Sequence, residues 1–516
     1  MERRSILVLF ALVLSAAGAP PAQEKVLSEE WLGLYMMGNK VGYSHTRVVA
    51  RTGEEGTRIT TSERTVIKIK RMGRSIASTE ESEVTEDDRG RLLSFSHRER
   101  QSAQEKATEG RSEGDFLVFT RIQGGREQEV EKVPYPAGAL PPYAVERYQR
   151  KLGLKEGAAG RVKIFLAAMP DRPAELTLRV GGREETEVLG EKRTLWRVEG
   201  SMQVRGVAID TVEWVSDDFV AWRVEAMRGL IKGYKLPREL ALREGKVEEL
   251  FLATLVAPDR KIEKARTVRE LAYRLTLPPG ESFQALPRGA GQEVRKEEGN
   301  RVEIRIGPVE PARPLPRPVR TPGMEKYLAP TPFLQSGDPA IAKQAAAVVG
   351  EEEDSLAAAR LLEKWVFKNI ANKHFGLGFA TAAEVMKNLE GDCSEHAVLL
   401  AALCRAAGIP SRVAAGLIYA DSLVAERAKS GVGAFGYHMW TEVFVGEWVP
   451  LDATLGVGYC DATHIALARS PLESESAIFD LVPVGLYIGR LQVEVLSPAG
   501  EVTPSERPGP GSGPGR

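Results

Sequence analysis

The sequence lacks an excess of charge of either sign. Its 516 residues include 70 Lys and Arg against 71 Asp and Glu, which leaves a formal net charge of -1. Without a surplus of positive charge, the chain has no global electrostatic attraction to nucleic acid or to an anionic membrane. We therefore expect no nucleic-acid partner.

Long apolar runs are also lacking beyond the N-terminus. Residues 478–489 are an apolar stretch near the C-terminus, but they fall well short of the roughly 20 residues that a membrane-spanning helix needs. We therefore expect no membrane span apart from the first segment of the chain.

The N-terminus has the layout of a secretory signal. Two arginines precede an apolar run (5–18), and small residues follow it. We expect residues 1–22 to be a signal peptide and the protein to be exported, either to a periplasm or to the extracellular space. Pro20 would hinder cleavage after Ala19, which leaves an uncleaved anchor as the alternative.

Cysteine is scarce, with three residues in the whole chain. Thiols of exported proteins tend to pair, and an odd count leaves one of them over. The simplest arrangement has a free Cys393, with Cys404 and Cys460 close enough to bridge, although the sequence cannot show that they are.

The chain is too long for one hydrophobic core and divides by pattern into an α+β protein. Short alternating strands fill the first half, six prolines interrupt the chain at 308–323, and a helical period of 3.6 follows. The expected segments are an antiparallel, half-barrel-like β domain (25–245), a small β domain (246–307), a proline-rich linker (308–325), a helical and β domain (326–490), and a short strand with a disordered Gly/Pro tail (491–516).

Cys393 occupies the first turn of a predicted helix. Thr381 and Glu384 form a capping-box pattern for the preceding helix, which Gly391 can end by a left-handed turn. Asp392 then caps a new helix, with Glu395 completing a second capping box. Free N–H groups and the helix dipole favour a thiolate at this position, whereas Cys404 lies in an apolar run where a thiol is inert.

A histidine and an aspartate occupy the two ends of a predicted hairpin downstream. His438 begins one strand and Asp452 ends the next, so both return to the same end of the sheet. A turn at Gly446-Glu447 would place Asp452 opposite Thr441, on the wrong face for His438. A bulge at Pro450 or a longer turn is therefore needed.

The segments "GDCSEH", "LCRAAGIPSRVAAGLIY" and "YHMWTEVFVGEWVPLDAT" resemble the transglutaminase-like superfamily, which has a papain-like fold. The resemblance covers residues 326–490. It implies that Cys393 is the nucleophile, His438 the general base and acid, and Asp452 the residue that orients the imidazole. The family usually has proline after the aspartate, where this chain has Ala453.

Other residues near these positions have weaker cases. Trp440, Tyr437 and Asp392 are candidates for the substrate cleft, and core packing explains Trp440 equally well. His396 is better explained as a helix-surface or packed histidine than as a catalytic one, and His464 has no partner that the sequence identifies. A metal site of Cys393, His396 and Cys404 lacks the usual ligand spacing. We expect no metal and no organic cofactor.

The resemblance implies an enzyme that forms a thioester from a glutamine carboxamide or another amide of a protein or peptide. An amine acceptor would give a crosslink, and water would give deamidation or proteolysis. A cysteine peptidase or amidase with the same triad is one alternative. A non-catalytic exported binding or scaffold protein is another, and the sequence leaves the oligomeric state open.

Overall fold

The fold is described from a computed structural model of the chain. The predicted signal peptide (1–22), His374 and the tail from residue 497 onward lie outside the described residues. The described residues are 23–54, 56–71, 74–101, 104–123, 126–204, 207–245, 254–370, 379–421, 431–474, 477 and 480–496.

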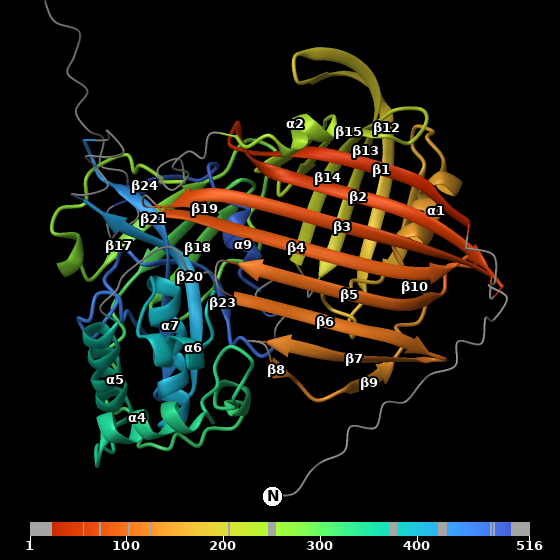
Figure 1. The fold of residues 1–516 in the computed structure, drawn as a ribbon. Coiled ribbons are helices and arrows are strands. Elements are labelled where there is room, and N and C mark those ends of the chain that lie inside the picture. The colour runs from red at the N-terminus through yellow and green to blue at the C-terminus, as the bar shows by residue number, and fades with distance from the viewer. Residues whose placement is uncertain are drawn as a thin grey trace, which may run out of the picture.

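The predicted α+β class is confirmed. Antiparallel sheets fill the first half, and helices with a further antiparallel sheet form the second. In Figure 1 the large sheet occupies the right-hand side, and the helical region lies to its left. A cation–π contact joins the two parts, with Lys106 Nζ 4.5 Å from the ring centre of Phe333.

The N-terminal region is one 16-stranded sheet in the order β10-β11-β12-β13-β14-β15-β16-β1-β2-β3-β4-β5-β6-β7-β8, with β9 paired to β7. Its strands pair antiparallel, except for a short parallel pairing of β10 and β11. The strands are β1 (Gln23–Met36), β2 (Asn39–Gly53), β3 (Gly56–Arg71), β4 (Arg74–Asp87), β5 (Leu92–Gln101), β6 (Gln104–Glu113), β7 (Phe116–Gln123), β8 (Arg126–Glu127), β9 (Glu131–Pro134), β10 (Ala139–Leu140), β11 (Ala159–Ile164), β12 (Ala174–Val188), β13 (Glu191–Val204), β14 (Val207–Val215), β15 (Ala221–Ala226) and β16 (Ile231–Lys235).

Helix α1 (Pro142–Leu152) packs against this sheet, and α2 (Arg238–Leu242) follows its last strand. Pro142 suits the first turn of α1, where its missing N–H costs nothing. The buried carboxylate of Glu86 accepts a 3.0 Å hydrogen bond from Tyr143 N, which ties the start of α1 to β4.

A second, four-stranded sheet follows, in the order β18-β19-β17-β24. Its strands are β17 (Leu271–Thr276), β18 (Gln292–Glu298), β19 (Arg301–Ile306) and β24 (Gln492–Leu496), and a short 3-10 helix, η1 (Ala265–Thr267), precedes them. The sequence pattern assigns β24 to the C-terminal tail segment, but the strand pairs antiparallel with β17. The small sheet is thus completed by a strand from the other end of the chain.

The C-terminal region packs helices against a four-stranded antiparallel sheet of order β22-β21-β20-β23. Buried side chains of α5 and α7 and of the sheet share one hydrophobic cluster. The elements are η2 (Glu325–Tyr327), α4 (Pro339–Val349), α5 (Ser355–Asn369), α6 (Ala382–Asn388), α7 (Cys393–Ala406), β20 (Ser411–Ala420), β21 (Ala434–Phe444), β22 (Trp448–Leu451), β23 (Ile465–Ser470) and α9 (Val482–Gly485).

The small sheet and the C-terminal region share a second hydrophobic cluster. Fully buried Phe435, at the start of β21, lies edge-on to Tyr273 of β17 and to Tyr419 at the end of β20. Tyr273 also donates a 2.9 Å hydrogen bond to the carbonyl of Ala462. The segment that the sequence separates as a small domain is therefore continuous with the core beside it.

The proline-rich segment lies on the C-terminal region and is bound to it by backbone hydrogen bonds. Leu315 N donates to the carbonyl of Val445, Arg317 N to that of Glu353, and Val319 N to that of Gly408. The Val319 side chain is buried. Proline keeps this segment extended, and these three N–H groups donate to carbonyl groups of the core.

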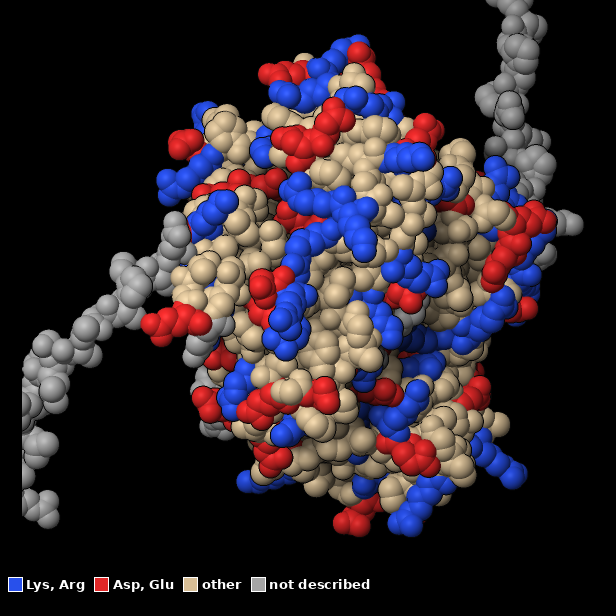
Figure 2. All heavy atoms as spheres, turned by 90° about the vertical axis from the view of Figure 1, so that its right-hand side faces the viewer, with Lys and Arg blue, Asp and Glu red and all other residues tan. Residues whose placement is uncertain are grey.

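Among the described residues, no helix is long and apolar enough to cross a membrane. Figure 2 shows basic and acidic side chains intermingled over the face that it presents, without a continuous area of one sign. This distribution agrees with the balanced composition of the chain.

Candidate active site

Cys393 is the first residue of α7, at the place that the sequence predicts. The N-cap Asp392 accepts a hydrogen bond from Ser394 N at 2.9 Å, and Glu395 Oε2 accepts one from Asp392 N at 2.9 Å. The predicted capping boxes of α7 and of α6, formed by Thr381 and Glu384, are both confirmed. Cys393 is half-buried and lies against the helical core.

The turn before α7 depends on glycine. Gly391 has a φ of 143°, a conformation that side chains with a Cβ rarely adopt. A Cβ at this position would lie 2.4 Å from the Cβ and Cγ atoms of Glu395. Glu395 is buried, and its carboxylate also accepts a hydrogen bond from Ala380 N. Burial, then the nearby charge of Asp392, raises the pKa of Glu395 to about 8.

His438 and Asp452 lie in direct contact. His438 Nε2 is 2.9 Å from Asp452 Oδ2, and their side chains are 9% and 0% exposed. β22 pairs Leu451 with Thr441, so the register differs by one residue from that of a turn at Gly446-Glu447. The longer turn arises because Val445 lies outside both strands, and its N–H bonds to the carbonyl of Glu447. Asp452 thereby faces His438.

A network of backbone hydrogen bonds fixes Asp452 after β22. Asp452 Oδ1 accepts a 2.8 Å hydrogen bond from Thr454 N, and its carbonyl accepts from Leu455 N and Gly456 N. Ala453, where the related family usually has proline, is buried within this turn. The turn is therefore held by hydrogen bonds without the proline ring.

The charges at this site favour an ion pair. Burial alone would lower the pKa of His438, but the charge of Asp452, and then the interaction with Cys393, raise it to about 9. Burial alone would also raise the pKa of Asp452, but the histidines that contact it hold that pKa well below its usual range. At neutral pH the arrangement is a protonated imidazole beside an ionised carboxylate.

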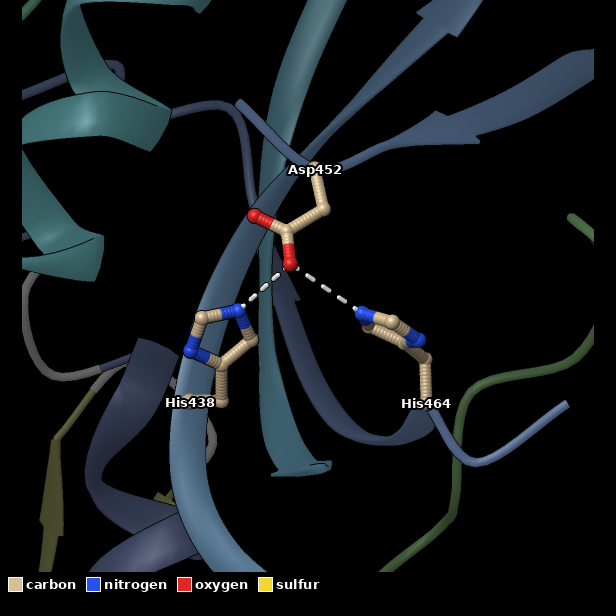
Figure 3. A group of neighbouring side chains, drawn as sticks. All are labelled: His438, Asp452 and His464. Carbon is tan, nitrogen blue, oxygen red and sulfur yellow. Dashed lines mark hydrogen bonds and ion pairs between the residues drawn. The ribbon is translucent and has the colours of Figure 1, made fainter. Parts of the chain in front are cut away.

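A second histidine contacts the same carboxylate, and the sequence does not reveal it. His464, directly before β23, places Nε2 3.3 Å from Asp452 Oδ2, and its side chain is 2% exposed. Figure 3 shows His438 and His464 on either side of Asp452, each facing the same oxygen. The pairing of β23 with β20 brings His464 to this place. No spacing or motif in the sequence indicates that pairing.

The ligand atoms of His438, Asp452 and His464 all lie within 4.8 Å of one another. That spacing would admit a metal ion, and among the described residues no other group of three or more such side chains has it. Both histidines already form direct contacts with Asp452 Oδ2, at hydrogen-bonding distances. We therefore interpret the three side chains as a hydrogen-bonded group.

Trp440 lies beside both histidines. Its ring centre is 6.3 Å from that of His438, in a nearly parallel orientation, and 5.3 Å from that of His464, edge-on. It lines a cavity of about 250 Å³ together with His464 and Cys460. Tyr437, the neighbouring candidate, packs instead against the cluster of the small sheet, and burial raises the pKa of its hydroxyl.

Of the surface and packed positions that the sequence allows for His396, the structure shows the packed one: the residue is fully buried, and its Nδ1 lies 2.6 Å from the carbonyl oxygen of Asp392. All three cysteines are free, so a disulfide between Cys404 and Cys460 is not formed. Cys404 is buried in the helical core, whereas Cys460 packs beside Trp440 in a separate cluster. Burial raises the pKa of both of these thiols.

Comparison with known families matches one part of the chain. Residues 342–453 match the model of the transglutaminase-like superfamily. This core contains Cys393, His438 and Asp452, each within the matched range. The chain as a whole extends well beyond the transglutaminase-like core on both sides.

Individual relatives are distant. An uncharacterized protein of Haemophilus influenzae is 26% identical over 147 residues, and the match covers 25% of this chain and 40% of the length of that relative. A beta-barrel-like protein of Brucella abortus has a TM-score of 0.30 at 13% identity, and covers 42% of this chain and 98% of its own. A protein of Cytophaga hutchinsonii, described as a candidate cysteine protease, has a TM-score of 0.28 at 15% identity, with 46% and 90% covered. These TM-scores are too low to support an argument about function.

Substitution of Gly391→Ala is expected to destabilise the protein by about 1–3 kcal/mol, because the new methyl group requires a strained φ and displaces Glu395 from its cap. Denaturant unfolding would measure the loss. Gly337→Ala is the matched control, since a Cβ there meets no atom within 4 Å. Equal stability of the two variants would contradict the role given to Gly391.

Proposed function

We propose that the protein is an exported cysteine enzyme of the transglutaminase-like type. In this proposal Cys393 is the nucleophile, His438 the general acid and base, and Asp452 the residue that orients the imidazole. The observation that carries the proposal is the buried contact of His438 with Asp452; the charge of Asp452, and then the interaction with Cys393, raise the pKa of the imidazole to about 9. A cysteine at a helix N-terminus beside such an imidazole is an activated nucleophile.

The first half-reaction would form a thioester. Cys393 Sγ attacks the carbonyl carbon of a carboxamide or peptide amide, so that a C–S bond forms and the carbonyl electrons move to oxygen. When the tetrahedral intermediate collapses, the C–N bond breaks and His438 gives its proton to the departing ammonia or amine. The backbone N–H of Cys393 is positioned by the helix terminus to donate to the oxyanion.

The second half-reaction would release the acyl group. An amine or a water molecule loses a proton to His438 and attacks the thioester carbonyl, and the sulfur leaves as a thiolate. A lysine amine gives a crosslinked product, whereas water gives a carboxylate. The Asp452 carboxylate stays ionised throughout and stabilises the imidazolium that each half-reaction requires.

Protein or peptide amides are the proposed substrates, because the transglutaminase-like core is the matched part of the chain. Hydrolysis by the same three residues, as in a cysteine peptidase or amidase, is the second candidate function. A scaffold without catalysis would have no need of a buried ion pair beside a half-buried thiol. Buried titratable groups with strongly shifted pKa values cluster at functional sites.

Cys393→Ala is expected to abolish both amine incorporation and peptide hydrolysis, because no other group can form the thioester. His438→Gln should lower the rate by at least about 100-fold, since proton transfer by a positioned group contributes that much or more. The assay would incubate the purified full chain with a glutamine-containing protein and a labelled amine.

Labelling by iodoacetamide at neutral pH, mapped by mass spectrometry, provides an activity-independent control. Wild-type protein should be alkylated first at Cys393, and Cys460→Ser should leave that rate unchanged. Failure of the wild type to react at Cys393 would reject the proposal that the protein is a cysteine enzyme.

The value of kcat/KM should fall above about pH 9, because His438 then loses the proton that it must donate. In Asp452→Asn the alkaline limb should move to lower pH, since the neutral amide no longer supports the positive charge of the imidazole. A limb at the same pH in both proteins would show that another group controls it.

Export through residues 1–22 is part of the proposal, on the basis of the sequence pattern alone. Expression of the full chain in a bacterium, followed by fractionation, should place it outside the cytoplasm. Intact mass spectrometry would then distinguish a cleaved N-terminus from an uncleaved anchor. A full-length chain confined to the cytoplasm would exclude export.

A further inference from the structure

The carboxylate of Asp452 has a second cationic partner on the side away from His438. His464 Nε2 is 3.3 Å from Asp452 Oδ2, the same oxygen that lies 2.9 Å from His438 Nε2 (Figure 3). The Asp452 side chain is wholly buried, out of reach of bulk water, and the two histidines are the side chains that contact this oxygen. Its position therefore depends on both rings.

His464 is itself held on its other side by Asp461. His464 Nδ1 lies 3.1 Å from the Asp461 carbonyl oxygen and 3.4 Å from Asp461 Oδ1. Asp461 Oδ1 accepts hydrogen bonds from the backbone N–H and the hydroxyl of Thr463, at 2.9 and 2.6 Å. These bonds fix the carboxylate against which the ring rests.

Asp461 in turn contacts an arginine from a distant part of the chain. Arg266, in η1 before the small sheet, places Nη1 2.9 Å from Asp461 Oδ2. Its Nη2 also donates to the Thr463 hydroxyl and to the carbonyl of Tyr419. Positive and negative groups thus alternate in one connected series: Arg266, Asp461, His464, Asp452 and His438.

The contacts of His464 define its protonation state. Both ring nitrogens face oxygen atoms that can only accept a hydrogen bond: a carboxylate at Nε2 and a backbone carbonyl at Nδ1. A neutral imidazole has one N–H and would satisfy only one of them, whereas the imidazolium satisfies both. Although burial opposes a charge here, the contacts with Asp452 and Asp461 raise the pKa of His464 to about 9.

We infer that His464 is a positioning residue for Asp452, and that Arg266 supports it through Asp461. This inference rests on the proposed acyl-transfer function. His464 holds the carboxylate in the orientation that serves His438, and its positive charge moderates the field that Asp452 exerts on the His438 ring. The segment before the core therefore contributes to the site.

Other charged groups around His464 are largely paired with one another. Arg469 lies 2.8 Å from Glu442, and Arg269 is paired with Glu310. The charged residues that share the cavity with His464 are Arg269, Glu310, Arg360, Glu442, Asp461 and Arg469. Because Asp452 and Asp461 are the carboxylates in contact with the ring, they set its charge.

His464→Ala should lower kcat by about 10–100-fold, the usual cost of removing a supporting partner, and change KM little. Imidazole added in solution should restore part of kcat, because the lost ring borders a cavity of about 250 Å³. His464→Gln keeps an N–H donor without the charge. It should retain most of kcat and move the alkaline limb of kcat/KM to higher pH, the opposite of Asp452→Asn.

Arg266→Met and Arg266→Lys extend the test along the series. Arg266→Met should change kcat and the pH profile in the same direction as His464→Gln, but by less. Arg266→Lys should keep the wild-type profile, because it supplies a positive charge. His97→Gln is the matched control, because His97 lies 3.8 Å from a carboxylate in the large sheet, away from this site. Thermal unfolding of each variant would confirm that it is folded.

A second measurement is independent of turnover. With six histidines in the chain, selective ¹⁵N labelling of the full protein should resolve the His464 ring, which we expect to be doubly protonated at pH 7. His464→Gln should raise the pKa of His438. A neutral His464 at pH 7 would overturn the inference. So would folded His464→Gln and Arg266→Met variants that keep the wild-type kcat and pH profile. So would stoichiometric bound zinc whose removal by a chelator abolishes activity.

The two proposals fail in different ways. Absence of turnover and of Cys393 labelling in the wild type would reject the enzyme, and the ¹⁵N measurement would still decide the state of His464. Normal wild-type activity with unaffected His464 and Arg266 variants would reject only the positioning role.

Discussion

The structure depends on one buried carboxylate. Asp452 has no exposed surface, and an ionised carboxylate in such a place is tolerated only when charges and hydrogen bonds replace water. Two imidazole rings share its Oδ2 atom, and the N–H of Thr454 satisfies Oδ1. The turn before β22, the position of β23 and the contact with the small sheet all serve this requirement.

Local sequence signals predict the part of the site that is local. Asp392 and Glu395 specify a helix start at Cys393, because capping depends on residues a few positions apart. The left-handed turn that ends the preceding helix lies at Leu389, not at Gly391 as the sequence predicts. The alternation of β21 and β22 likewise predicts that His438 and Asp452 return to one end of a hairpin. Whether they face each other depends on one extra residue in the hairpin. The sequence allows either a bulge or a longer turn, and the structure has the longer turn.

The remaining parts depend on long-range pairing, which residue patterns do not encode in a readable form. His464 reaches Asp452 because β23 pairs with β20, and Arg266 reaches Asp461 because the small sheet shares a core with β20 and β21. The place of β24 beside β17 is equally non-local. The prolines of residues 308–323 predict an extended segment, but the backbone bonds that bind it to the core require the fold itself.

The pairing of β24 with β17 also sets an order of events during synthesis. β17 follows η1, which carries Arg266, and its neighbour β24 is the last strand described in the chain. The chain is made from its N-terminus, so the small sheet lacks this strand until the residues of β24 have been added. The sheet that follows Arg266 is consequently completed only after Cys393, His438 and Asp452 have all been made.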